Sequence, residues 1–290
     1  MDSVPIAFIE LVAGIVSQET LAVLRQGQAI LGRWTTAIPA YQPFYLDIGI
    51  RDGEKLFFSQ RWHDETSVDI FSQWNFATCY FLDVTVTLDV ERFGKQFQPM
   101  STEHFNALKK MIARQRRRIW LFSIEDCTKE LVENVGELLG VCGGPQRLFI
   151  SPRVTPFAPV VKQLLSKGGV CEFALYRKPC PVWLVPTLTA QLQAGILRVI
   201  DLNVDESKAE LYERLIDMAV SHIIKKEHAY YFLSYPKKYA HLLRPLRSEM
   251  NRSRALSHDA QGEKKVKVVY SPQSEYFSYK WRRQDPLFYF

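Results

Sequence analysis

The first 38 residues carry apolar side chains at intervals of three or four positions, which is the period of a helix face. These positions are Phe8, Val12, Ile15, Leu21, Leu24, Ile30, Leu31, Trp34 and Ile38. Pro5 suits the first turn of a helix, where its missing N–H has no partner, and Pro39 stops the helical pattern. We therefore predict a module of three short helices over residues 1–40.

The pattern changes after residue 40. Phe44–Ile50 and Lys55–Ser59 are apolar runs typical of strands, and Asp52-Gly53 lies between them. Asp-Gly between two such runs is a strong hairpin signal. We predict a second domain over residues 41–290 that opens with this hairpin.

From about residue 80, strand-like apolar runs alternate with helical stretches. The predicted strands are Phe81–Val90, Arg118–Ile124, Arg147–Ser151, Cys171–Tyr176, Ile196–Leu202 and Ala229–Ser234. The predicted helices are Thr102–Arg114, Thr128–Leu139, Phe157–Ser166, Val182–Gln193 and Glu206–Val220. Strands that alternate with helices of about 10–15 residues indicate βαβ units and a largely parallel sheet, so the expected fold class is α/β. The spacing of the strands is typical of stacked repeats.

Local signals support these elements. Ser101 precedes a helical pattern and can cap its first turn. Gly143-Gly144, Gly168-Gly169 and Gly195 each follow a helix directly before a strand, and glycine accepts the left-handed conformation that closes a helix. Residues 248–265 are polar and charged, which predicts a flexible loop. Strand-like runs return over residues 266–270 and 276–281.

Alternation along a strand predicts which side chains face the open side of the sheet. The residues expected to face the helices are Leu148, Ile150, Cys171, Phe173, Leu175, Leu197 and Val199. The outward candidates for partner binding are then Trp120, Arg147, Phe149, Glu172, Tyr176, Arg198 and Tyr230. Aromatic and arginine side chains are typical anchors of interfaces. Core packing explains each of them equally well, and a register error of one residue would reverse every assignment.

The net charge of +6 is unevenly distributed. Residues 222–290 hold 14 Lys and Arg against 6 Asp and Glu. This basic region could meet an acidic partner or nucleic acid, and a solvated basic face explains it more simply. Arg114–Arg118 is expected to stay solvated at a helix end, where cations favour the helix dipole. Residues 276–283 interleave aromatic and basic residues, as RNA binding would require, or form a packed strand edge.

Composition places the chain among folded proteins, with 47% hydrophobic and 23% charged residues. The five cysteines form no CxxC pair, so we expect reduced core thiols and a cytoplasmic or nuclear location. We find no signal peptide pattern and no apolar run of about 18 residues. Nucleotide-binding, hydrolase and zinc-peptidase motifs do not occur, and the six histidines lack metal-ligand spacing. We therefore expect a non-enzyme without cofactor or metal.

One further pattern joins the opening residues. Val4-Pro5, the apolar residues of the first two helices and Gly32-Arg33-Trp34 together resemble a divergent F-box, with Val4 in place of the usual leucine. The opening Met-Asp-Ser-Val-Pro also resembles nematode-expanded families of F-box-type proteins. This resemblance implies the substrate-recognition subunit of an SCF-type cullin–RING ubiquitin ligase. The positions that would pack internally or bind its Skp-type adaptor are Pro5, Ile9, Leu21, Leu24 and Trp34.

The alternating region resembles atypical leucine-rich repeats. It departs from their pattern because the ladder asparagine is missing from most units, with only Asn203 near the expected place. The resemblance implies a curved βα-repeat stack behind the helical module, with a protein substrate bound to its sheet. Alternatively, the helical module caps the open end of the stack and the chain is a scaffold outside any ligase. An enzyme or nucleic-acid binder without a recognisable motif is the third hypothesis.

Overall fold

The computed structural model describes residues 41–61, 67–88, 90, 96–115, 117–151, 155–197, 199–203, 206–224, 230–236 and 265–268. The predicted helical module, nearly all of the predicted loop over 248–265 and the predicted strand over 276–281 lie outside these residues. The chain divides into two compact units, Met1–Pro181 and Val182–Phe290.

The predicted hairpin opens the described part of the first unit. Strands β1 (Gln42–Arg51) and β2 (Glu54–Arg61) pair antiparallel, with Arg51 opposite Glu54. Asp52 and Gly53 between them have φ values of 53° and 83°. Positive φ at both central residues is what a two-residue hairpin with the favoured twist requires, and Asp-Gly supplies it at low cost.

The sheet of the first unit is largely parallel, which confirms the α/β class. Its further strands are β3 (Cys79–Thr87), β4 (Gln98–Pro99), β5 (Leu121–Ile124), β6 (Arg147–Ile150) and β7 (Glu172–Pro179). Within this unit the strand order is β7-β6-β5-β3-β1-β2-β4. Strands β1, β3, β5, β6 and β7 run parallel, whereas β2 and the short β4 add an antiparallel margin.

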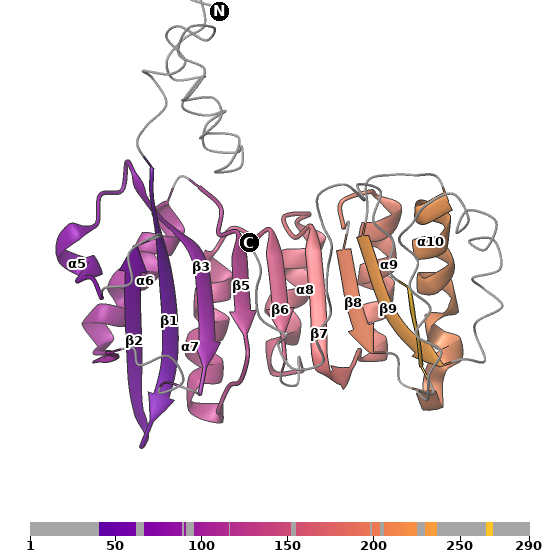
Figure 1. Cartoon of the computed structure of the whole chain (residues 1–290), viewed down its shortest axis with the longest axis horizontal. Coiled ribbons are helices and arrows are strands. Elements are labelled where there is room, and N and C mark those ends of the chain that lie inside the picture. Colours follow the sequence, from indigo (N-terminus) through magenta and orange to yellow (C-terminus); the bar gives the residue numbers. More distant parts are fainter. Residues whose placement is uncertain are drawn as a thin grey trace, which may run out of the picture. The chain divides into compact units, whose positions relative to one another are not determined.

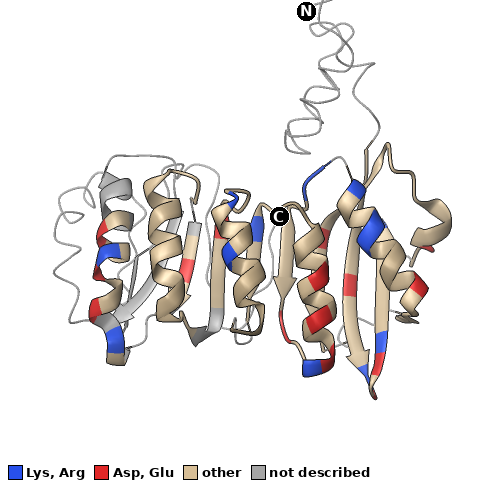
Figure 2. Ribbon diagram, turned by 180° about the vertical axis from the view of Figure 1, so that it is seen from behind, with Lys and Arg blue, Asp and Glu red and all other residues tan. Residues whose placement is uncertain are grey.

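The long helices of this unit lie on one face of its sheet. They are α6 (Thr102–Arg114), α7 (Lys129–Val141) and α8 (Ala158–Ser166), which follows the short 3₁₀ turn η1 (Thr155–Phe157); a shorter helix, α5 (Ile70–Gln73), precedes β3. From β3 to β7 each parallel strand is placed beside the previous one, and crossovers that advance in one direction with one hand bring their helices to the same side. Figure 1 shows α6, α7 and α8 side by side behind these strands, and Figure 2 shows the same side of the sheet from behind, with the helices in front. Consecutive helices contact each other.

The core lies between these helices and two rows of strand residues in register. The rows are Leu46, Val84, Phe122, Leu148 and Phe173, and Ile48, Val86, Ile124, Ile150 and Leu175. All ten side chains are almost fully buried. The helices contribute Leu108, Leu131, Val135, Leu138, Val161 and Leu164, which are equally buried. Burial of these apolar surfaces is the main force that holds the two layers together.

A buried residue recurs three positions before each of the last four members of the first core row, Val84, Phe122, Leu148 and Phe173. The preceding buried residues are Phe81, Ile119, Pro145 and Val170, and in the second unit Leu197 stands in the same relation to Ile200. The motif is therefore apolar-x-x-apolar-x-apolar. From Ile119 to Leu197 it returns every 25 to 27 residues.

The predicted helix signals are confirmed at both ends. The Ser101 side chain accepts a hydrogen bond from the backbone N–H of His104, and the His104 ring lies within hydrogen-bond distance of the Ser101 N–H, which makes a capping box. Gly144, Gly168 and Gly195 have φ values of 101°, 71° and 68°. These conformations are open to glycine and strained for other residues, so the three glycines mark where the chain leaves each helix.

The second unit continues the alternation of helices and strands. Its elements are η2 (Val182–Leu184), α9 (Val185–Gln193), β8 (Val199–Asn203), η3 (Glu206–Tyr212), α10 (Glu213–Ile224), β9 (Tyr230–Pro236) and β10 (Lys265–Val268). Strand β8 pairs parallel with β9, and β10 pairs antiparallel with β9. None of the described helices in either unit is long and apolar enough to span a membrane.

Candidate partner-binding face

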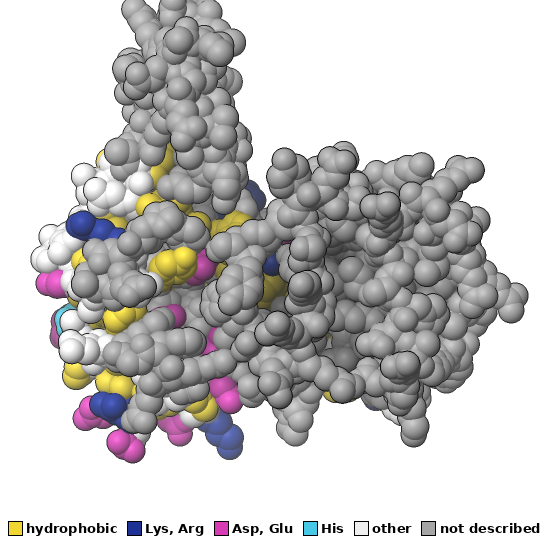
Figure 3. All heavy atoms as spheres, viewed as in Figure 1, with side chains coloured by type: hydrophobic (Ala, Val, Ile, Leu, Met, Phe, Trp, Pro, Cys, Tyr) yellow, Lys and Arg dark blue, Asp and Glu magenta, His cyan; other side chains and the backbone are white. Residues whose placement is uncertain are grey.

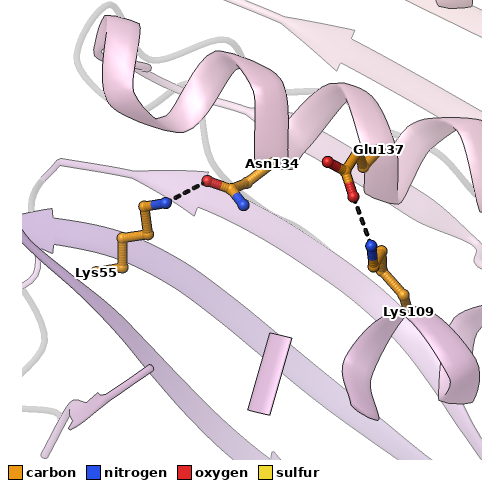
Figure 4. A network of polar contacts seen from close by, with 4 residues as sticks. All are labelled: Lys55, Lys109, Asn134 and Glu137. Carbon is orange, nitrogen blue, oxygen red and sulfur yellow. Dashed lines mark hydrogen bonds and ion pairs between the residues drawn. The ribbon is translucent and has the colours of Figure 1, made fainter. Parts of the chain in front are cut away.

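The helix-covered side of the first unit is held by ordinary structural contacts. The Lys55 ammonium on β2 donates a hydrogen bond of 2.6 Å to the Asn134 side-chain oxygen on α7. Lys109 on α6 forms an ion pair of 2.6 Å with Glu137 on α7 (Figure 4). Glu137 is half-exposed, and pairs of this kind contribute at most about 1 kcal/mol. These contacts join the helices to one another and to the sheet, and the opposite side of the sheet carries a different set of polar residues.

Two rows of strand residues point away from the helices. The first row is Tyr45, Asp83, Leu121, Arg147 and Glu172, and the second is Asp47, Thr85, Ser123, Phe149 and Ala174. We call these ten residues, together with Trp120 directly before β5, the outer face. Figure 3 looks onto this side, and on its described part acidic side chains lie among hydrophobic ones. The outer face is thus far more polar than the core rows that alternate with it.

Arg147 organises one end of the outer face. Its Nε lies 2.5 Å from a carboxylate oxygen of Glu172 on the neighbouring strand β7, and the two side chains are 18% and 27% exposed. The guanidinium carbon also lies 4.5 Å from the ring centroid of Trp120 and 5.0 Å from that of Phe149. The ion pair with Glu172 and the cation–π contacts with Trp120 and Phe149 all favour the same position of the Arg147 guanidinium, so together they hold it in place.

Asp83 occupies the middle of the first outer row. Burial raises the pKa of its carboxyl to about 7, the positive charge of Arg147 opposes this rise and the negative charge of Asp47 adds to it. Its Oδ1 atom is inaccessible to solvent and has no hydrogen-bond partner. Burial also raises the pKa of Glu172, and the Arg147 charge opposes that rise. The outer face therefore holds carboxyl groups at a desolvated surface.

Tyr45 stands beside Asp83 on β1, in direct register with it. Burial raises the pKa of its phenol far above the usual value, and the nearby Asp83 carboxylate raises it further. The hydroxyl consequently stays protonated at any physiological pH. Tyr45 is therefore a neutral polar neighbour of the Asp83 carboxyl and adds no charge to the outer face.

The structure brings together four of the seven residues predicted to face outward. Trp120, Phe149 and Glu172 lie around Arg147, on three adjacent strands of one face. The side chains of Tyr176, Arg198 and Tyr230 lie outside the described residues. The proposed adaptor-binding residues, Pro5, Ile9, Leu21, Leu24 and Trp34, also lie outside them.

The predicted alternation is correct for β6 and needs correction at two other strands. Cys171 was expected to face the core, but it precedes β7 and is only half-buried, and the buried residue there is Val170. In β8 the alternation was expected to place Val199 inward. The buried residues described in this strand are Ile200 and Leu202, a register shifted by one. Both errors have one cause. A buried residue lies three positions before the first core residue of each strand, Val170 before Phe173 and Leu197 before Ile200. Because three is an odd number, strict alternation through both buried residues is impossible and the predicted register fails at the start of the strand.

The basic run after α6 also differs from expectation. Arg117 is not solvated but only 7% exposed, and its guanidinium carbon lies 5.0 and 5.1 Å from the ring centroids of Tyr41 and Tyr80. Gln115 turns the chain inward, because its side chain accepts a hydrogen bond from the Phe81 N–H and donates one to the Arg117 carbonyl. A charged run predicts exposure only on average, and aromatic neighbours overrode it here.

Sequence reasoning missed Asp47 and Asp83 as parts of the site. Both interrupt otherwise apolar strands, and a charged residue within a buried strand is costly unless it serves a purpose. These charged residues within apolar strands could have been recognised in the sequence as candidates for a site. What sequence could not show is that the two carboxyls belong to neighbouring strands and to the same face.

The cysteines of the described region are free thiols. Burial raises the pKa of Cys142 and Cys180 to about 12, and that of Cys127 to about 11, so none of the three forms a reactive thiolate near neutral pH. Among the residues that the structure describes, no group of three or more His, Cys, Asp or Glu side chains could hold a metal ion.

The fold and the outer face define an α/β protein with one helix-covered side and one polar side. No protein-family model, no curated protein and no solved structure matches the chain. Any statement of function therefore rests on the residues and geometry of this chain.

Proposed function

We propose that this chain is a protein-interaction subunit whose outer face binds a protein partner, and that it serves as the substrate-recognition subunit of a cullin–RING ubiquitin ligase. One observation carries the first half of the proposal. Trp120, Arg147, Phe149 and Glu172 converge from adjacent strands on the side of the sheet opposite the helices. Aromatic and arginine side chains on a rigid surface are the residues that most often dominate binding energy.

The recurring buried motif supports a repeat-type scaffold. Apolar-x-x-apolar-x-apolar is the strand signature of leucine-rich repeats, and its return every 25 to 27 residues falls within their repeat length. In such stacks the sheet side is the usual binding surface, because the helices occupy the other side. We propose that the chain is an atypical member of this architecture, with the outer face as its binding surface.

The ligase half of the proposal rests on the sequence of residues 1–40, which would dock a Skp-type adaptor through the apolar residues Leu21 and Leu24. Full-length chain co-expressed with the adaptor should co-elute with it in gel filtration. The double substitution Leu21→Asp and Leu24→Asp should abolish co-elution, because two charges would replace apolar contacts.

Leu211→Asp is the matched control, since Leu211 is 49% exposed in η3 and far along the chain. It should retain co-elution, and thermal melts should show that both variants fold. If the wild-type chain fails to bind the adaptor, the ligase role is wrong and the scaffold hypothesis takes its place.

Partner binding is tested on the outer face itself. Trp120→Ala and Phe149→Ala should each weaken binding of a protein captured by the wild-type chain by about 1–3 kcal/mol, or roughly 5- to 150-fold, because truncated aromatic anchors lose packing and release Arg147. Glu133→Ala on the exposed side of α7 is the control and should leave affinity unchanged. Equal binding by all three variants would show that the outer face is not the interface.

A further inference from the structure

We propose that the last predicted helix of the N-terminal module docks on an aromatic patch of the first unit, where the chain enters the sheet. Trp74 and Phe76, in the loop between α5 and β3, and Arg114 at the end of α6 form this patch, which we call the entry patch. The docking segment is residues 30–38, whose apolar side chains recur every four residues. The inference depends neither on adaptor binding nor on the outer face, so it can fail while both of those stand.

Phe76 leaves apolar surface uncovered at the entry patch. It is 41% exposed, and in the described part of the first unit no other large hydrophobic side chain is exposed. Its ring contacts Trp74, whose ring centroid lies 4.7 Å from that of the buried Phe81. The Arg114 guanidinium carbon lies 5.9 Å from the Phe76 ring centroid. An aromatic cluster that extends from the core to an exposed ring is a surface that a packed helix would cover.

The loop that carries Phe76 is fixed by its own hydrogen bonds. The Asn75 carbonyl accepts bonds of 3.1 and 2.7 Å from the backbone N–H groups of Thr78 and Cys79. The Asn75 side-chain oxygen accepts a further bond of 2.9 Å from the Ala77 N–H. The loop therefore presents Phe76 in a defined position, and a docking helix would meet a preformed surface that costs little ordering entropy.

The path of the chain brings the N-terminal module to this loop. The backbone N–H of Gln42 donates a hydrogen bond of 3.0 Å to the Thr78 carbonyl, so β1 begins directly beside the loop. Because consecutive Cα atoms are about 3.8 Å apart, Phe76 lies within about 8 Å of Thr78, and Ile38 within about 15 Å of Gln42. Residues 39–41 are thus too short a connection to carry the preceding helix away, and its last turn stays within reach of the entry patch.

The side chains of the segment complement the patch. Ile30, Trp34 and Ile38 follow each other at intervals of four, so a helix would place all three on one face. That face matches the exposed Phe76 ring in chemistry, because both are apolar and gain free energy when water leaves the contact.

Charge favours the same arrangement. Arg114 is exposed, and among the described residues it has no carboxylate partner. Residues 1–24 hold Asp2, Glu10 and Glu19 and no lysine or arginine. A docked residue 30–38 segment would keep this acidic part of the module at the side of the first unit where Arg114 lies, which is electrostatically favourable.

Docking would give the N-terminal module a fixed orientation on the first unit. Trp34 would then pack internally, whereas Leu21 and Leu24 belong to an earlier segment and stay free for an adaptor. In a ligase subunit, this contact would set the position of the adaptor relative to the outer face.

A photo-crosslinking residue in the full-length chain tests the contact. Phe76→p-benzoylphenylalanine keeps an aromatic ring in the loop, and illumination should join it to a residue within 30–38 of the same chain. Peptide fragmentation must place the cross-link before Pro39, because Gln42 lies beside the loop in any case. Glu133→p-benzoylphenylalanine is the control and should not reach this segment, since the first half of α7 lies at the opposite, carboxyl end of the parallel strands.

Hydrogen exchange in the full-length chain gives a second measure. Phe76→Asp should speed amide exchange over residues 30–38 about tenfold, because a charge in the entry patch would disfavour apolar docking. Exchange in α7 and α8 should not change, which would show that the first unit remains folded. The proposal is overturned if position 76 joins a second copy of the chain instead, if no cross-link falls within residues 30–38, or if Phe76→Asp leaves their exchange unaltered.

Discussion

Asp83 is a residue whose ionisation opposes folding. Folding moves its carboxyl from water into the outer row, where burial raises the pKa from 3.8 to about 7. A raised pKa means that the folded state binds the proton more tightly than the unfolded state. The resulting stability is therefore complete below the unfolded pKa and is lost as pH rises towards the folded pKa.

This sign gives a prediction for the free energy of unfolding. Asp83→Asn should stabilise the protein at pH 8 by roughly 1–3 kcal/mol, because an amide needs no ionisation in the desolvated site. The gain should shrink at pH 5, where the folded wild-type carboxyl is already protonated. Urea unfolding at pH 5, 6, 7 and 8 measures both values.

Glu133→Gln provides the comparison, since Glu133 is exposed on α7. Its free energy of unfolding should track that of wild type at every pH. An Asp83→Asn variant that is less stable than wild type at pH 8 would show that the carboxylate is paired in the folded protein.

At the scale of elements, the loops that close α7 and α8 pack against each other. Gly144 follows α7 with a φ of 101°, and a Cβ on it would lie 3.3 Å from the Gly169 Cα in the next loop. Backbone therefore meets backbone where successive βα units stack. Glycine is needed here for two reasons, the left-handed conformation and the close approach.

Gly144→Ala should consequently destabilise the protein by about 1–3 kcal/mol in urea unfolding, because the new methyl group adds strain on both counts. Gly136→Ala is the matched control, within α7 and with open space where its Cβ would lie. It should raise stability by about 0.5–1 kcal/mol, since alanine favours a helix over glycine. Opposite signs for the two substitutions would locate the effect in the loop contact, and equal signs would contradict it.

At the scale of the whole molecule, the packed core and the proposed recognition surface lie on opposite sides of the sheet of the first unit. The core rows of the first unit face α6, α7 and α8, while the outer rows carry the charged and aromatic residues. Because each strand contributes to both sides by alternation, the outer residues can vary while the core rows hold the fold constant. The proposed adaptor segment would add a third function at the start of the chain.

The sequence by itself determined the elements, because their signals are local. Helix α6 begins and ends where its cap and apolar period predict, the Asp52-Gly53 hairpin forms, and the glycine stops are in place. Sequence also predicted that Arg147 and Phe149 share a face, since alternation within one strand depends on neighbours alone. The register of β8 was predicted wrongly. The buried Leu197 before the strand suggested that Val199 faces the core, whereas the buried residues of the strand are Ile200 and Leu202.

Only the tertiary structure decided which strands are neighbours and in what register. That pairing brings Asp83 of β3 into one row with Arg147 of β6 and Glu172 of β7, although long crossovers separate them in the chain. It also buries Arg117 beside the rings of Tyr41 and Tyr80, which are distant from each other in the sequence. The physical reason is that parallel strands pair through contacts distant in sequence, and electrostatic environments exist only after those contacts form.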